Sequence, residues 1–186
     1  IYNFKSIKNS KEIKGMINSH ISDGVALTKF LYWIKKINKK KINEFEAQKK
    51  LEYFRKLNKN YLFPSFNTIA GAGKNGAIVH YGTPDSENPI KDGEMLLVDS
   101  GIQCSGGTTD ATRTVILGNP DQKQQKIFTL VLQAHIHLAS QVFPEGTSGN
   151  SLDAITRSCL WNAGLDFGHG TGHGVGAFLN VHEGPQ

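Results

Sequence analysis

Two aspartates and a group of histidines are the side chains of this sequence best suited to do chemistry together. Asp99 and Asp110 flank a short polar turn in "LLVDSGIQCSGGTTDATRT". His169 and His173 lie four residues apart in "FGHGTGHGVG", and His182 follows in "NVHEGP". Carboxylates combined with imidazoles suit Mn²⁺, Co²⁺, Fe²⁺ or Zn²⁺ in hydrolytic sites, and exclude thiolate-type centres. The residue types therefore predict a metal-dependent hydrolytic site.

The two aspartates are expected to face each other across a β-hairpin. Two runs of β-forming residues flank the polar turn near "CSGG", which is a hairpin signal. A turn centred between Cys104 and Ser105 pairs Asp99 with Asp110 and puts their Cβ atoms about 5 Å apart. Like charges that face each other repel, and a cation between them would remove the repulsion. The alternative is one aspartate in the turn and the other in solvent.

The glycines around His169 and His173 favour an extended segment. Gly170, Gly172 and Gly174 argue against a helix, because each costs about 1 kcal/mol relative to alanine. In a strand, residues i and i+4 also share one face, and glycine allows a ligand to approach the backbone closely. Hydrogen-bonded histidines in a glycine-rich loop are the alternative.

Another histidine, His80, stands in the apolar run "NGAIVHYG", which is predicted as a strand. A lone histidine in such a strand is more often a buried structural residue than a catalytic one. His20, His135 and His137 fall in predicted helices with no carboxylate at ligand spacing, and are interpreted as structural.

Helices and strands that would position these side chains are predicted from periodicity and capping. The first helix covers about residues 9–38, with Ile13, Ile17, Ile21 and Val25 on one stripe and Leu27, Leu31 and Ile34 on a neighbouring one. Further helices are expected to begin at Asn43 with a capping box, at Asn119-Pro120 and at Ser151, and to end near residues 57, 142 and 164. Strands are expected at "FNTIA", at "GAIVHY", in the hairpin, and at "LDFGHG" and "FLNVHEG". The order of elements in the second half repeats the first without its hairpin. No low-complexity linker separates the two halves, which predicts one α+β domain.

Composition narrows the function classes. The chain has 186 residues, 38% of them hydrophobic, and no apolar run long enough for a membrane helix. Two cysteines without CxxC spacing predict neither a disulfide framework nor a cysteine zinc site, so a reduced, cytoplasmic protein is expected. The net charge of +5 is concentrated in the lysine-rich first 60 residues. No aromatic-basic motif accompanies these lysines, so nucleic-acid binding is not expected.

These motifs together resemble the pita-bread metallopeptidases, a group that includes methionine aminopeptidases, prolidases and Xaa-Pro aminopeptidases. The resemblance is carried by "LLVDSG…GTTDATRT" and "HGTGHGVGAFLNVHEGP", and it covers almost the whole chain. "NGAIVHY", "HGTGHGVG" and "LNVHEGP" are most similar to the Xaa-Pro aminopeptidase subfamily. The resemblance implies a pita-bread fold with a pseudo-twofold repeat of helices and antiparallel sheet.

The resemblance also implies a role for each residue of the site. Asp99 would bind one divalent metal ion, Asp110 would bridge two, and His173 would ligate the second. His80 and His169 would line the substrate site, and His182 would contact the substrate carbonyl and assist proton transfer. Two ions, most often Mn²⁺ in such enzymes, would hold a bridging hydroxide as nucleophile. The implied substrates are peptides with proline at the second position, and the resemblance leaves a homodimer open.

Two departures from the family pattern set further expectations. Residues 1–186 correspond to one partial catalytic domain, without the N-terminal domains of long relatives. The family also places two glutamate ligands downstream of the "HEGP" motif, whereas this sequence stops at Gln186. Weak metal binding and little peptidase activity are therefore expected of this chain alone. The alternative is a non-catalytic pita-bread module that binds peptides or protein partners.

Overall fold

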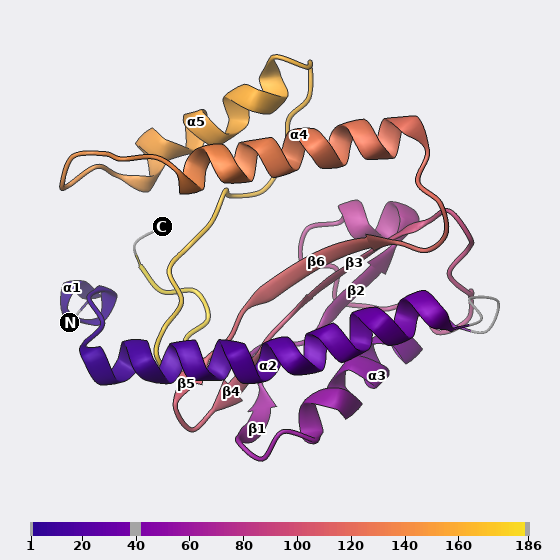
Figure 1. Ribbon diagram of the computed structural model, residues 1–186, viewed down its shortest axis with the longest axis horizontal. Coiled ribbons are helices and arrows are strands. Elements are labelled where there is room, and N and C mark those ends of the chain that lie inside the picture. Colours follow the sequence, from indigo (N-terminus) through magenta and orange to yellow (C-terminus); the bar gives the residue numbers. More distant parts are fainter. Residues whose placement is uncertain (1, 38–41, 185–186) are drawn as a thin grey trace.

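Helices combine with two small antiparallel sheets in the computed structural model, which describes residues 2–37 and 42–184 (Figure 1). The helices are α1 (Tyr2–Ser6), α2 (Ser10–Lys36), α3 (Glu44–Lys56), α4 (Gln122–Ala139), α5 (Gly149–Trp161) and the short 3-10 helix η2 (Gly73–Ala77). The strands are β1 (Tyr61–Pro64), β2 (Ile69–Ala72), β3 (Met95–Ser100), β4 (Ile102–Cys104), β5 (Gly107–Thr108) and β6 (Ala111–Ile116). The predicted α+β class is confirmed.

The first two long helices begin where the sequence predicts, each with a capping box at its start. Asn9 accepts amide hydrogen bonds at the start of α2, and Glu12 bonds back to the backbone of Asn9. Asn43 and Glu46 form the same capping box at the start of α3. Each box satisfies backbone donors that the first helical turn leaves without partners. Gly24 lies inside α2 without interrupting it, and the predicted end of this helix at residue 38 lies outside the described residues.

The two helices of the second half begin elsewhere than predicted. The N-cap of α4 is Asp121 rather than Asn119, because the Asp121 carboxylate accepts an amide hydrogen bond in the first turn. The helix ends at Ala139, short of the predicted end at residue 142. The N-cap of α5 is Ser148 rather than Ser151. Several adjacent residues here can cap a helix, so the sequence alone did not decide among them.

The predicted hairpin is present, but its strands belong to two different sheets. Its base pairs β3 with β6, in a sheet of order β2-β3-β6. Its tip pairs β4 with β5, in a sheet of order β1-β4-β5. The strands change sheet at Gly101 on one side and at Thr109 and Asp110 on the other. The candidate ligand Asp110 therefore lies at the break between two sheets.

The core lies between α2, α3 and the β2-β3-β6 sheet. Phe30 and Ile34 of α2 are fully buried there, opposite Leu51 of α3 and Leu96 of β3. The stripe predicted on α2 from four-residue spacing faces the other way. Its four side chains are between 48% and 63% exposed: Ile13, Ile17, Ile21 and Val25. The helix packs through the neighbouring predicted stripe, because Leu27 and Ile34 are buried and Leu31 packs against the core.

The N-terminal half of α2 lies directly on the tip of the hairpin (Figure 1). A Cβ atom built on Gly15 would come within 2.0 Å of the carbonyl oxygen of Gly106. Real Cβ atoms do not approach this closely, so the contact is made by backbone against backbone. Glycine at position 15 therefore allows the hairpin tip to sit against the helix.

Three of the predicted strands are absent from the described residues. The run 76–81, which was predicted as a strand, contains the end of η2 and a turn. The nearest strand, β2, ends at Ala72. The segments 165–170 and 178–184 are irregular, and a single bridge between Gly174 and Glu183 joins this part of the chain. Strand β2 overlaps "FNTIA" but begins at Ile69, and strand β1 was not predicted. Across residues 2–37 and 42–184, each helix is too short or too polar to cross a bilayer.

Candidate metal and substrate site

The two aspartates of the hairpin do not face each other as the sequence predicted. Asp99 lies opposite Thr112, and the Thr112 hydroxyl donates a hydrogen bond of 2.7 Å to Oδ1 of Asp99. The turn is formed by residues 105 and 106, because Cys104 pairs with Gly107. This shift of the turn by one residue moves the register by two. Asp110 therefore lies one residue before β6, near Asp99 rather than opposite it.

Asp110 meets His173 from the glycine-rich segment. The Nε2 atom of His173 lies 3.2 Å from Oδ2 of Asp110. The other ring nitrogen, Nδ1, lies 2.8 Å from the carbonyl oxygen of Gly174. A carbonyl can only accept, so Nδ1 carries a proton, and Nε2 of the neutral ring presents its lone pair to the carboxylate. Two acceptors at this distance require either a second proton or a cation between them.

Several charged groups act on Asp110. Burial raises the pKa of Asp110, and the negative charge of Asp99 raises it further. The imidazoles of His173, His182 and His20 lower the same pKa. A carboxylate that is half withdrawn from water and close to a second carboxylate favours a bound cation.

His173 and His182 of the C-terminal segment lie near each other, and His80, about 100 positions earlier, lies near His182. The ring of His182 lies 4.2 Å from that of His173 and 6.4 Å from that of His80, measured between ring centroids. His80 does not lie in a strand, as predicted, but in a turn with a φ of 55°. A non-glycine residue rarely adopts this conformation, so neighbouring structure must hold it.

A buried carboxylate holds the segment that carries His80. Glu44, at the start of α3, is 2% exposed. It accepts the backbone amides of Ala72 and Asp85 at 2.6 and 2.7 Å. It also accepts the side-chain amide of Asn75 at 3.0 Å and the hydroxyl of Tyr81 at 2.8 Å. Four donors on one carboxylate tie both ends of the His80 turn to helix α3.

A buried amide holds the segment that carries His182. The side chain of Gln103, which is 1% exposed, donates to the carbonyl of Leu179 at 3.0 Å and accepts the amide of Leu179 at 3.2 Å. The hydroxyl of Thr108 donates to Gln103 at 2.7 Å and fixes the orientation of the amide. Leu179 has a φ of 71°. The hairpin thus binds the irregular C-terminal segment as a neighbouring strand would.

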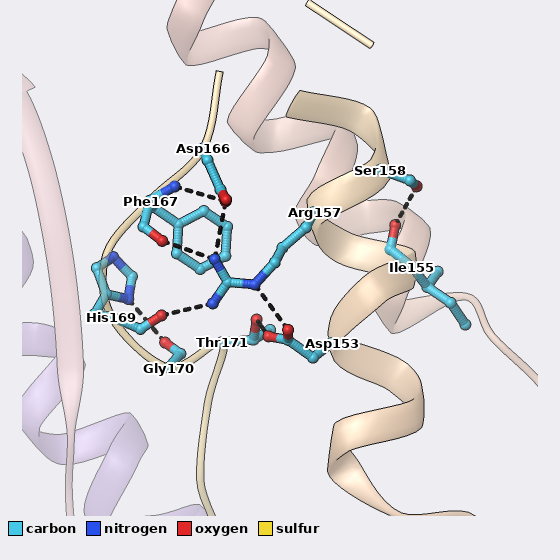
Figure 2. Close-up of polar contacts among 9 residues, drawn as sticks. All are labelled: Asp153, Ile155, Arg157, Ser158, Asp166, Phe167, His169, Gly170 and Thr171. Atoms are coloured by element: carbon cyan, nitrogen blue, oxygen red, sulfur yellow. Dashed lines mark hydrogen bonds and ion pairs between the residues drawn. The ribbon is translucent and has the colours of Figure 1, made fainter. Parts of the chain in front are cut away.

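His169 occupies a different environment from the other three histidines. Its ring lies 4.8 Å from the ring of Phe167, and its Nδ1 lies 2.7 Å from the carbonyl oxygen of Gly170. Figure 2 shows this segment wrapped around Arg157 of α5. Sequence reasoning missed Arg157, although Asp153 four residues before it is the spacing of a helical ion pair.

The structure brings Asp110 and His173 into one pair, with Asp99 close by. Among the described residues, no three side chains of His, Cys, Asp or Glu converge as a ready ligand set. The facing acceptors of Asp110 and His173 fit a divalent cation, whereas the ligand shell is smaller than the sequence predicted. His20, which the sequence interpretation left as structural, acts electrostatically on this pair from α2.

The sequence matches the profile of metallopeptidase family M24 over residues 14–186. A probable Xaa-Pro aminopeptidase P from Paracoccidioides brasiliensis is 50% identical over 185 residues, which cover 97% of this chain and 30% of the relative. Aminopeptidase P2 from Arabidopsis thaliana is 49% identical over 185 residues, which cover 98% of this chain and 26% of the relative. The chain thus spans less than a third of the length of these relatives.

Two solved structures of aminopeptidases are similar to this protein over almost its whole chain. The X-prolyl aminopeptidase of Caenorhabditis elegans, described as a cytosolic enzyme with a di-nuclear active site, superposes with a TM-score of 0.91 at 44% identity. The similarity covers 99% of this chain and 31% of that one. The X-Pro aminopeptidase of Thermotoga maritima superposes with a TM-score of 0.86 at 26% identity, over 99% of this chain and 50% of that one.

Proposed function

Because the chain belongs to metallopeptidase family M24 and adopts part of the pita-bread fold, we propose that it hydrolyses the bond between an N-terminal residue and proline. The substrates are then peptides with proline at the second position, as the names of the relatives suggest. The observation that carries the proposal is the contact between Nε2 of His173 and Oδ2 of Asp110 at 3.2 Å. Without a cation, this contact needs a proton on both ring nitrogens of His173, whereas a divalent cation would take the lone pairs of both groups.

Asp110 and His173 are the residues that would hold a metal ion, and Asp99, whose charge acts on Asp110, is proposed as the third ligand. We propose two divalent ions, with Mn²⁺ preferred over Co²⁺, Fe²⁺ or Zn²⁺. Bound divalent ions supply an acidified water and polarise a carbonyl oxygen. The tautomer of His173 suits this role, since its Nδ1 proton is held by the carbonyl of Gly174 and its Nε2 is left free.

The histidines would handle the substrate. His182 lies against His173 and is proposed to hold a proton for the leaving amine and to contact the scissile carbonyl. His80, beside His182, and His169, on the Phe167 ring, are proposed to line the site around proline. We place the activity in the cytoplasm, following the cytosolic relative.

Hydrolysis of a proline peptide tests the proposal directly. The chain is incubated with Mn²⁺ and a tripeptide Arg-Pro-Pro, and the slow release of the N-terminal arginine that the sequence leads us to expect is followed by chromatography. The matched substrate Arg-Ala-Pro should be cleaved much more slowly, and the His173→Ala variant should cleave neither. The proposal is refuted if Mn²⁺ binds to the chain and no arginine is released.

A second function is favoured by one observation. Within residues 2–37 and 42–184, a complete set of three metal-binding side chains is not assembled. A non-catalytic module that binds peptides would need no such set. In that case a labelled Arg-Pro-Pro peptide would bind equally well with Mn²⁺ and with a chelator, and would remain intact.

A further inference from the structure

Arg157 forms several hydrogen bonds with the segment that precedes His173. The guanidinium of Arg157 donates to the carbonyl of Phe167 at 2.7 Å and to the carbonyl of His169 at 2.8 Å (Figure 2). It also donates to the carboxylates of Asp153 at 2.7 Å and Asp166 at 2.9 Å. The side chain of Arg157 is only 16% exposed. All three of its nitrogens therefore have acceptors, and two of these belong to the backbone of the segment.

The same arginine begins a stack that ends on His169. The guanidinium lies 4.0 Å from the centroid of the Phe167 ring. The Phe167 ring in turn lies 4.8 Å from the His169 ring, with an angle of 37° between the planes. A guanidinium is attracted to the face of an aromatic ring. The orientation of the His169 imidazole is thus linked to Arg157 through both the backbone and the ring of Phe167.

Residues 165–172 have few other hydrogen bonds among the described residues, whereas Gly174 and Gly176 beyond them are tied to Glu183 and Asn180. The loop of residues 165–172 contains Gly168, Gly170 and Gly172, and glycine loses more conformational entropy on ordering than any other residue. Residues 165–172 form neither helix nor strand. Asp153 helps from α5, because its other oxygen accepts the hydroxyl of Thr171. The anchors of the loop therefore lie on one face of α5, and Arg157 makes most of them.

Solvent-exposed ion pairs usually contribute little, and two isolated pairs with Asp153 and Asp166 would be of that kind. The bonds to the carbonyls of Phe167 and His169 are different, because they constrain the backbone conformation of the loop and not only the side chains. A planar fork of donors can fix such a path, whereas a lysine ammonium cannot. The arrangement is thus built to position a loop rather than to neutralise charge.

We propose that Arg157 is a positioning residue that sets the pose of His169. This inference rests on the proposed function only in taking His169 as a contact to the substrate. Loss of the guanidinium should leave the metal pair of Asp110 and His173 in place and release the His169 ring. In a metal-loaded chain, the KM for Arg-Pro-Pro should then rise at least about tenfold, with kcat less affected.

NMR on the metal-free chain tests the positioning without any catalysis. In the wild type, residues 167–171 should have backbone order parameters near 0.85, and the ring protons of His169 should be shifted by the ring current of Phe167. In Arg157→Met and Arg157→Lys, the order parameters should fall below about 0.6 and the ring-current shift should vanish. In Phe167→Leu, the shift should vanish while the backbone remains ordered.

Arg113→Met is the matched control, since Arg113 is exposed on β6 and, among the residues that the structure describes, bonds only to the carbonyl of the preceding residue. Arg157→Lys keeps the positive charge, so it allows the test to be made even where Arg157→Met fails to fold. Unchanged His169 resonances in both Arg157 variants, or the same changes in Arg113→Met, would overturn the proposal. A chain that cleaves no proline peptide would refute the proposed function and leave this NMR result intact.

Discussion

The hydroxyl of Thr109 donates a hydrogen bond of 2.7 Å to Oδ2 of Asp23, 86 positions earlier in the chain. Asp23 of α2 and Arg55 of α3 form a buried ion pair, with bonds of 2.8 and 2.9 Å. The Thr109 hydroxyl also accepts the amide of Ile102 at 2.8 Å. Because Thr109 directly precedes Asp110, two helices fix the backbone beside the candidate metal ligand.

Removing one member of this buried pair should be costly. Arg55→Met leaves the Asp23 carboxylate buried without its cation, and we expect unfolding free energy to fall by about 3–5 kcal/mol in urea titrations. Asp23→Leu combined with Arg55→Met should recover most of that loss, because neither charge then remains uncompensated. A single variant that loses less than about 1 kcal/mol would contradict the role given to the pair.

Metal affinity should depend on Asp110. Asp110→Asn removes a charged ligand opposite His173 and should weaken Mn²⁺ binding at least about tenfold in calorimetric titration. Asp121→Asn is the matched control, because asparagine caps a helix as well as aspartate does and Asp121 lies at the start of α4. Equal Mn²⁺ affinities in the two variants would exclude Asp110 as a ligand.

Alkaline pH should remove the hydrogen bond from the Tyr81 hydroxyl to Glu44, which helps to hold the His80 turn. Burial, followed by the hydrogen bond to Glu44 and its charge, raises the pKa of Tyr81 to about 12. A pKa raised in the folded state contributes stability that is full below the unfolded value near 10 and is lost as pH rises through about 12. Wild type should therefore exceed Tyr81→Phe in stability at pH 8, and the difference should shrink between pH 10 and 12. A difference that stays constant over that range, in urea titrations, would show that Tyr81 does not titrate as described.

The segment that carries His182 should loosen when Gln103 is replaced. Gln103→Met has a similar volume but loses both bonds to Leu179. Backbone order parameters of residues 179–183 should fall, and unfolding free energy should decrease by about 1–3 kcal/mol because buried backbone groups lose partners. Gln133→Met, at an exposed position of α4, should change neither quantity.

Local features of the fold could be predicted from the sequence, and contacts between distant segments could not. Asn43 and Glu46 form their capping box within a single turn, so the sequence was sufficient there. The hairpin was also predicted, but its register depends on which two of several small residues form the turn, and helix α2 packs against that turn. The sequence could not decide this.

The candidate site follows the same division. Its residue types were apparent from the aspartates and histidines, and Asp110 and His173 do meet. The conformation of the segment around His80 is set by Glu44, more than 30 positions away, and so it was wrongly predicted as a strand. Such side chains give no periodic signal, because each acts once and at a distance.

Because Gly15 lies against the carbonyl of Gly106, replacing it with alanine should have the opposite of the usual effect of that substitution in a helix. Replacing glycine by alanine inside a helix normally stabilises it by up to about 1 kcal/mol, and Gly24, with open space around it, should follow this rule. Gly15→Ala should instead lower the melting temperature, because the hairpin tip would have to move away from α2. A helix optimised for its own propensity would thus be a poorer support for the strands that carry Asp99 and Asp110. Comparing the melting curves of Gly15→Ala and Gly24→Ala therefore separates the intrinsic stability of the helix from the packing of the hairpin that carries the site.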